Sequence, residues 1–74
     1  MTKKELSAAQ VKFGENLKAI REKKNMSLLD VSYNCSLDDS HISKIELGKF
    51  NVTLGTMLEL AKGLGVHPAD LLNY

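Results

Sequence analysis

The chain has 74 residues, of which 43% are hydrophobic and 26% are charged, and its formal net charge at pH 7 is +1. This length allows one domain with a small apolar core, and the composition excludes an intrinsically disordered chain. A net charge so close to zero also excludes the strongly basic class of nucleic-acid-binding domains, so a case for DNA must rest on motif and geometry.

The first part of the chain predicts one long helix. Residues 1–6 are polar and charged, and we expect a flexible N-terminal start followed by a single domain over residues 7–74. Ser7 or Gln10 can cap a helix that continues to about Lys23. Its inward stripe is predicted from apolar residues at helical spacing, namely Phe13, Leu17 and Ile20.

A short helix, a tight turn and a second short helix are predicted next. Ser27 and Asp30 have the spacing of a capping box, although Asp replaces the usual Glu or Gln, and they begin a helix over about Leu28–Cys35. A second helix follows over about Asp39–Leu47, and Gly48 stands where a C-terminal cap is needed. Two helices joined by a short turn form the helix-turn-helix pattern. The inward residues of this pattern are predicted to be Val31, Ile42 and Ile45.

Two further helices complete the predicted fold. Thr53 is a suitable N-cap for the first of them, which ends at Gly65, and His67 and Pro68 open the second. No stretch alternates as a β-strand does, so we expect an all-α domain of five helices. The predicted apolar residues of these two helices are Leu54, Met57, Leu58, Ala61, Leu64, Leu71 and Leu72.

The sequence indicates neither a membrane segment nor a catalytic site. No apolar run approaches the roughly 18 residues of a membrane span and no signal-peptide pattern is present, so we expect a cytoplasmic protein. The single Cys35 cannot form an internal disulfide, which fits a reducing compartment. Cys35, His41 and His67 lack zinc-ligand spacing, and no catalytic triad can be composed. We expect no metal, no cofactor, no small-molecule ligand and no enzymatic activity.

A longer set of residues surrounds the helix-turn-helix pattern. It comprises Arg21, Ser32, the run Ile42-Ser43-Lys44-Ile45-Glu46, the pair Gly48-Lys49, and Asn51, Thr53, Leu54, Leu58, Leu60 and Ala61. Over residues 13–72 this set resembles the phage-repressor and Cro-type regulators, the XRE family. The resemblance implies a compact lambda-repressor-like fold and a sequence-specific regulator of transcription, a repressor or controller that binds a near-palindromic site on double-stranded DNA as a homodimer.

The resemblance also implies which side chains meet DNA bases. In this fold the second motif helix enters the major groove, where exposed side chains reach base edges. The implied base-contacting residues are Asp39, Ser40, Ser43 and Lys44. Lys44 can donate to guanine, the serines can bond to several bases, and Asp39 can accept from a cytosine amino group. We interpret the neighbouring Asp38 as a helix cap.

Phosphate contacts are expected at helix N-termini and in the loop that follows the second motif helix. The candidates are Ser27, Lys49, Asn51 and Thr53, although Ser27 and Thr53 are also ordinary caps and both roles can hold together. The family often has glutamine where this chain has Leu28, so one phosphate contact is expected to be missing.

Three structural features are implied by the same resemblance. Arg21 and Glu46 are expected to form a partly buried ion pair that ties the first helix to the third. The family usually has glycine at the position of Ser36, which predicts a positive φ there, with Asn34 as the alternative residue for that role. With no second domain in view, the homodimer interface is expected at the end of this one, on Val66, Leu71, Leu72 and Tyr74.

A second function stays open at this point. The acidic pair Asp38 and Asp39 at the start of the reading helix also suits an antitoxin-like or accessory module that uses the same fold to meet a protein partner. Salt-sensitive binding to duplex DNA would separate the two functions.

Overall fold

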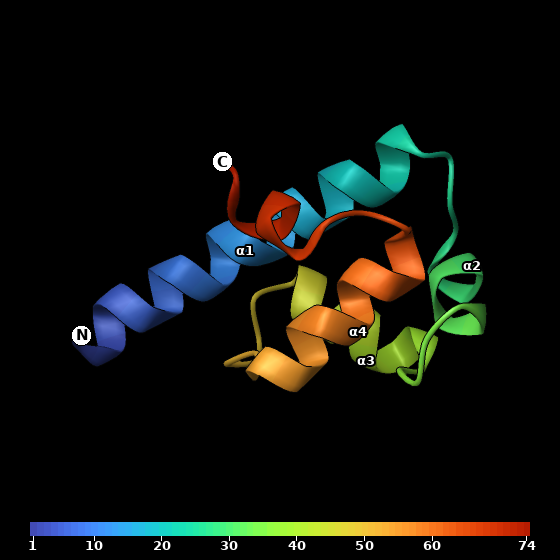
Figure 1. Ribbon diagram of the computed structural model, residues 1–74. Coiled ribbons are helices and arrows are strands. Elements are labelled where there is room, and N and C mark those ends of the chain that lie inside the picture. Colours follow the sequence, from blue (N-terminus) through green and yellow to red (C-terminus); the bar gives the residue numbers. More distant parts are fainter.

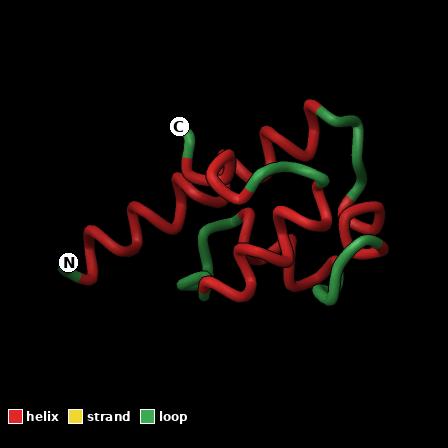
Figure 2. The backbone as a smooth tube through the Cα atoms, viewed as in Figure 1, coloured by secondary structure: helices red, strands yellow, loops and turns green.

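The computed structural model describes residues 1–74 and contains only helices (Figures 1 and 2). The elements in chain order are α1 (Lys3–Lys23), α2 (Leu28–Tyr33), α3 (Asp39–Glu46), α4 (Leu54–Leu64) and the 3-10 helix η1 (Pro68–Leu72). The all-α prediction is confirmed, except that the last of the five helices is a 3-10 helix. The first turns of α1 project beyond the other helices, and the C-terminus returns to lie beside α1 (Figure 1).

The start of α1 differs from the prediction. The helix begins at Lys3 and not near Ser7 or Gln10, so residues 3–6 belong to the helix and not to a flexible start. Thr2 is the N-cap: its hydroxyl accepts from the Glu5 backbone N–H, and the Glu5 carboxylate accepts from the Thr2 backbone N–H. These bonds hold the pKa of Glu5 below its ordinary value. This capping box explains why the chain becomes helical so early.

The caps of the two motif helices agree with the prediction, while both helices end earlier than expected. Ser27 and Asp30 form the predicted capping box at the start of α2. The helix ends at Tyr33, and not at Cys35. In α3 the last helical residue is Glu46, with Gly48 beyond it at a φ of 77°. This left-handed conformation is the one that glycine adopts without strain.

The helix α4 has the predicted caps and a different inward face. Thr53 accepts from the Thr56 backbone N–H, and Gly65 ends the helix with a φ of 69°. The side chains of Leu54 and Leu58 were expected inside but are 71% and 47% exposed. The predicted stripe follows only one edge of the helix, and the buried face is centred on Leu60, Ala61, Gly63 and Leu64.

One apolar core joins all five helices. Its nine buried side chains are Phe13, Leu17, Val31, Ile42, Ile45, Leu60, Ala61, Leu64 and Leu71. Ile20, expected inside, is partly buried and packs against this core. This core fixes α2, α3 and α4 against one another and leaves the outer face of α3 at the surface.

No helix has both the length and the apolar character needed to cross a membrane.

Candidate nucleic-acid interface

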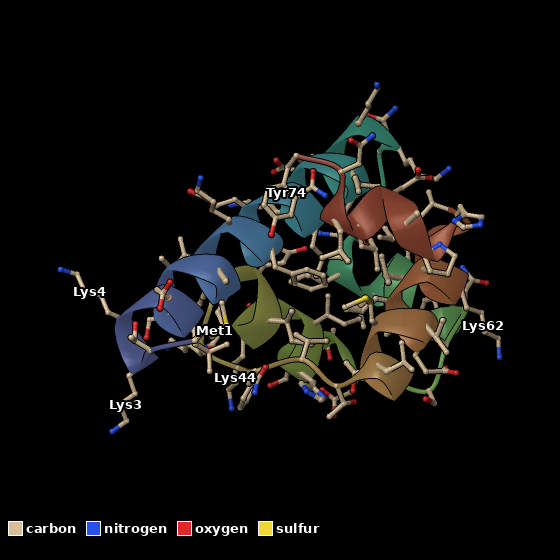
Figure 3. The ribbon with its side chains drawn as sticks, turned by 60° about the vertical axis from the view of Figure 1, so that its left-hand side comes forward. Met1, Lys3, Lys4, Lys44, Lys62 and Tyr74 are labelled. Carbon is tan, nitrogen blue, oxygen red and sulfur yellow. The ribbon has the colours of Figure 1, made fainter.

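The helix α3 separates its residues cleanly between core and solvent. Ile42 and Ile45 are at most 1% exposed and anchor the helix. On the other side Ser40 and Lys44 are exposed, one helical turn apart. Figure 3 shows the Lys44 side chain pointing away from the helices. Asp39 and Ser43, the other two residues predicted to contact bases, are half-buried at the edges of this outward face. The structure thus places the four on one helix, and their contact with bases stays a prediction.

The start of α3 is capped by the predicted side chain. Asp38 accepts from the His41 backbone N–H at 2.7 Å. Its carboxylate therefore neutralises part of the positive N-terminal end of the helix. This geometry confirms Asp38 as a cap, although its side chain is exposed, and leaves the half-buried Asp39 without a capping role.

The turn between α2 and α3 contradicts the predicted conformation. Ser36 does not have a positive φ, and the alternative Asn34 has a φ of −105°. The Ser36 backbone N–H instead donates to Glu59 Oε1 on α4 at 2.9 Å. This bond, together with the Ser36 hydroxyl and the nearby Lys62, lowers the pKa of Glu59. The prediction was wrong because the turn is held by a distant side chain and not by a left-handed residue.

The helix α1 clamps α3 through the predicted ion pair. Arg21 Nε donates to Glu46 Oε2 at 2.6 Å and Arg21 Nη2 donates to Glu46 Oε1 at 3.0 Å. The side chains are 12% and 7% exposed, respectively. Arg21 Nη1 also donates to the Met26 carbonyl oxygen at 2.9 Å. The hydrogen bonds to Glu46 raise the pKa of Arg21, partly opposed by burial. A planar guanidinium is suited to such two-pronged pairing.

A second contact from α1 reaches the end of α3, and the sequence analysis missed it. Gln10 Nε2 donates to the Gly48 carbonyl oxygen at 3.1 Å, across 38 residues of sequence. In the sequence Gln10 is only a polar residue on the predicted helix, and its hydrogen-bond partner can be identified only when the fold is known. Gln10 and Arg21, about three turns apart on α1, therefore both hold the C-terminal end of α3.

The four residues predicted to contact phosphate are all exposed. Ser27 and Thr53 are exposed N-caps of α2 and α4, so their role as caps is confirmed. Lys49 and Asn51 lie exposed in the loop after α3. All four side chains are therefore open to solvent, and phosphate contact by them stays a prediction.

The predicted dimer residues do not all lie at the surface. Leu71 is fully buried in the core of its own chain, so it cannot be an interface residue. Asn16 of α1 donates to the Asp70 and Leu71 carbonyl oxygens and fixes η1 with Leu71 turned inward. Leu72 and Tyr74 are exposed, whereas Val66 is half-buried against the core.

An apolar groove lies beside this end of the chain. Phe50 projects from the loop after α3, packs the edge of its ring against His41 at a centroid distance of 5.2 Å, and reaches the groove. Tyr74 lies on the opposite side of the view in Figure 3 from Lys44. The groove residues are Leu6, Ala9, Gln10, Phe13, Phe50, Asn51, Val52, Met57, Leu72 and Tyr74.

Comparison with known proteins agrees with this geometry. The family described as a helix-turn-helix domain matches residues 14–74, which include every helix except the first turns of α1. The chain belongs to this family. The XRE-type resemblance is thereby confirmed, and members of this helix-turn-helix family are DNA-binding transcription regulators and not enzymes.

Two curated relatives are control proteins. The chain is 41% identical over 63 residues to control protein C.BamHI of Bacillus amyloliquefaciens, covering 84% of this chain and 78% of the relative. It is 34% identical over 65 residues to control protein C.MunI of a Mycoplasma species, covering 86% and 88%. Both likenesses extend over most of each helix-turn-helix protein, so they include α3 as well as the helices that hold it.

A solved structure shows the same arrangement of helices. The restriction-modification controller protein C.AhdI from Aeromonas hydrophila superposes with a TM-score of 0.81 at 36% sequence identity. The match covers 86% of this helix-turn-helix chain and 97% of that protein. The chain is therefore a DNA-binding helix-turn-helix regulator of the controller type.

Proposed function

We propose that this chain binds a near-palindromic duplex site as a homodimer and controls transcription of the genes of a restriction-modification system, acting in the cytoplasm. The observation that supports this proposal is that α3 is fixed in place while its outer side chains are exposed. Its inner face is locked in the core, its C-terminal end is clamped by Arg21 and Gln10, and Ser40 and Lys44 are left in solvent. The controller names of the relatives support the genetic context.

Base reading is assigned to the outward face of α3. Lys44 is the donor suited to guanine, and Ser40 lies one turn nearer the helix start, where the major groove is entered. Asp39 would accept from a cytosine amino group, which offsets the cost of a carboxylate near phosphates. The surrounding Ser27, Lys49, Asn51 and Thr53 would fix the register by contacting the backbone.

Dimerisation is assigned to the apolar surface around Leu72 and Tyr74. These two side chains are 55% and 60% exposed, and the groove beside them brings in Phe50 at 40% exposure. Leu54 and Leu58 are also exposed on α4, the helix that contributes Met57 to the groove. Several large apolar side chains on one face of a small domain are typical of a protein interface. Two-fold pairing there would present two α3 helices to successive major grooves.

The alternative function is a module that meets a protein partner through the acidic start of α3. Its supporting feature is weakened, because the Asp38 carboxylate is occupied in capping α3. The other acid of the pair, Asp39, is half-buried.

Selection from a pool of random duplexes tests the proposal. We expect the protein to enrich one family of sites with two related half-sites about one helical turn apart. Affinity for the enriched duplex should fall steeply as salt is raised, because bound lysines release counterions. A pool that shows no enrichment, with binding no stronger than to random duplex, would favour the protein-partner function.

A further inference from the structure

The turn between α2 and α3 has few backbone hydrogen bonds of its own. The Asn34 N–H donates to the Val31 carbonyl at 3.1 Å, and the Cys35 N–H reaches the Ser32 carbonyl only at 3.4 Å. After Cys35, the next backbone bond within this segment begins at α3 itself. Side-chain bonds of Asn34 and Asp38 secure its two ends, but none of these bonds involves Ser36 in the middle of the turn. A contact from another helix to Ser36 would therefore help to set the angle between the two motif helices.

Glu59 on α4 supplies that outside contact. Its Oε1 accepts from the Ser36 backbone N–H at 2.9 Å, across 23 residues of sequence. No other backbone N–H of the turn donates to α4. A carboxylate is a strong acceptor for a backbone N–H, and its ionised form is favoured by the bond.

The helix that carries Glu59 is itself fixed against α2. A Cβ added to Gly63 would lie 2.8 Å from Val31 Cγ1 and 2.9 Å from the Val31 carbonyl oxygen, so the two helices touch through backbone. Leu60, one residue after Glu59, is fully buried. Glu59 is therefore attached to a rigid support when it holds Ser36.

We infer that Glu59 is a positioning residue for DNA reading: it holds the turn through Ser36 and thereby sets the orientation of α3. This inference rests on the proposed DNA-binding function. With Glu59 as acceptor the turn needs no left-handed residue, and none is present there.

Three variants separate this role from general effects of charge or stability. Glu59→Ala removes the acceptor, whereas Glu59→Gln keeps an oxygen that can accept from Ser36. Glu22→Ala is the matched control, because Glu22 is exposed on α1, lies outside the hollow that contains Ser43, and its loss changes the net charge equally. Each variant is tested on the duplex selected by the wild-type protein and on a random duplex of equal length.

The expected result is a loss of specificity confined to one variant. Glu59→Ala should bind the selected duplex about two- to tenfold less tightly relative to random duplex, the range that one lost hydrogen bond covers. Glu59→Gln should recover most of this ratio, and Glu22→Ala should leave it unchanged. If the variant were only less stable, a smaller fraction of the protein would be folded, and binding to both duplexes would weaken equally. The ratio of the two affinities would then be unchanged. An unchanged ratio in Glu59→Ala would overturn the inference.

A measurement without DNA keeps the inference separate from the proposed function. In the wild-type protein the Ser36 amide proton shift should follow the ionisation of Glu59 in an acid titration, with a midpoint below the ordinary 4.5 because of the hydrogen bond and the nearby Lys62. Glu59→Gln should abolish this step. A Ser36 amide that does not respond would refute the positioning contact even if DNA binding is confirmed. Failure to select any duplex would refute DNA reading while leaving the contact intact.

Discussion

Gly14 of α1 and Glu46 of α3 approach so closely that a Cβ on Gly14 would lie 2.5 Å from the Glu46 carbonyl oxygen. The Ile45 carbonyl oxygen would be equally near. Glycine weakens an isolated helix by up to about 1 kcal/mol relative to alanine. Here that cost is outweighed, because only glycine lets α1 lie directly on the end of α3 and bring Arg21 to Glu46.

Gly14→Ala should therefore destabilise the protein although alanine favours helices. The backbone of α3 must move away, and overpacking of this kind costs about 1–3 kcal/mol, more than the propensity gain. Gly55→Ala is the control, because a Cβ there meets only Thr53 Oγ1 at 3.9 Å and should be neutral or stabilising. Urea unfolding of both variants measures the difference. Equal stability of the two would mean that the α1–α3 approach is looser than described.

The ion pair between Arg21 and Glu46 should be costly to break from either side. Both side chains are largely buried, so removing one partner leaves the other as an uncompensated charge, at a cost of about 3–5 kcal/mol. Arg21→Ala also loses the bond to the Met26 carbonyl. The double variant should be less destabilised than the sum of the single ones. A double-mutant cycle by chemical unfolding measures this coupling, and a coupling near zero would contradict the pairing.

The two lysines nearest the proposed DNA site should behave differently. Lys44 projects from α3, so Lys44→Ala should relax the preference at one base pair and cost about 1–3 kcal/mol on the selected site. Lys49 lies in the loop, so Lys49→Ala should weaken binding to all sequences and reduce the salt slope by about one unit. Titrations of selected and random duplexes at several salt concentrations distinguish these effects. Identical behaviour of the two variants would refute the assignment.

Neighbouring leucines in η1 should separate folding from assembly. Leu72→Asp should yield a folded monomer, because Leu72 is exposed on the proposed dimer surface. Leu71→Ala should instead lower the free energy of unfolding by about 2–5 kcal/mol, because Leu71 is fully buried. Leu29→Asp, on an exposed side chain of α2 outside that surface, is the control. Sedimentation at micromolar concentration measures assembly, and a monomeric wild-type protein, free and on DNA, would overturn the dimer.

Local cap chemistry explains what the sequence predicted well. Ser27, Thr53 and Gly65 bond to backbone within a few residues, so their roles follow from spacing alone. The start of α1 was missed although Thr2 and Glu5 carry the same kind of signal at the same spacing. Residues 1–6 were predicted to be flexible because they are polar and charged, although the capping box can be seen in the sequence.

The features that could not be predicted depend on contacts between distant residues. The acceptor for Ser36 is 23 residues away on α4, and the bond that turns Leu71 inward comes from Asn16 on α1. Neither partner can be chosen before the helices are packed. The Arg21–Glu46 pair is equally distant in sequence, and only the family resemblance gave it. The inner face of α3 followed from helical periodicity, because it needs only Ile42 and Ile45, whereas the base-contacting residues came from the family resemblance.

Glycine substitutions should have opposite effects at two turns. Asn25 is the one non-glycine residue with a positive φ, at 56°, and it ends α1 where the Met26 N–H donates to the Arg21 carbonyl. Asn25→Gly should stabilise the protein by up to about 1 kcal/mol, because glycine adopts this conformation without a Cβ penalty. Ser36→Gly should instead cost about 0.5–1 kcal/mol, because Ser36 is not left-handed and glycine only adds freedom to the unfolded chain. Thermal unfolding measures the change in stability of each variant. A gain in stability from Ser36→Gly would indicate a left-handed residue in this turn and contradict the described conformation.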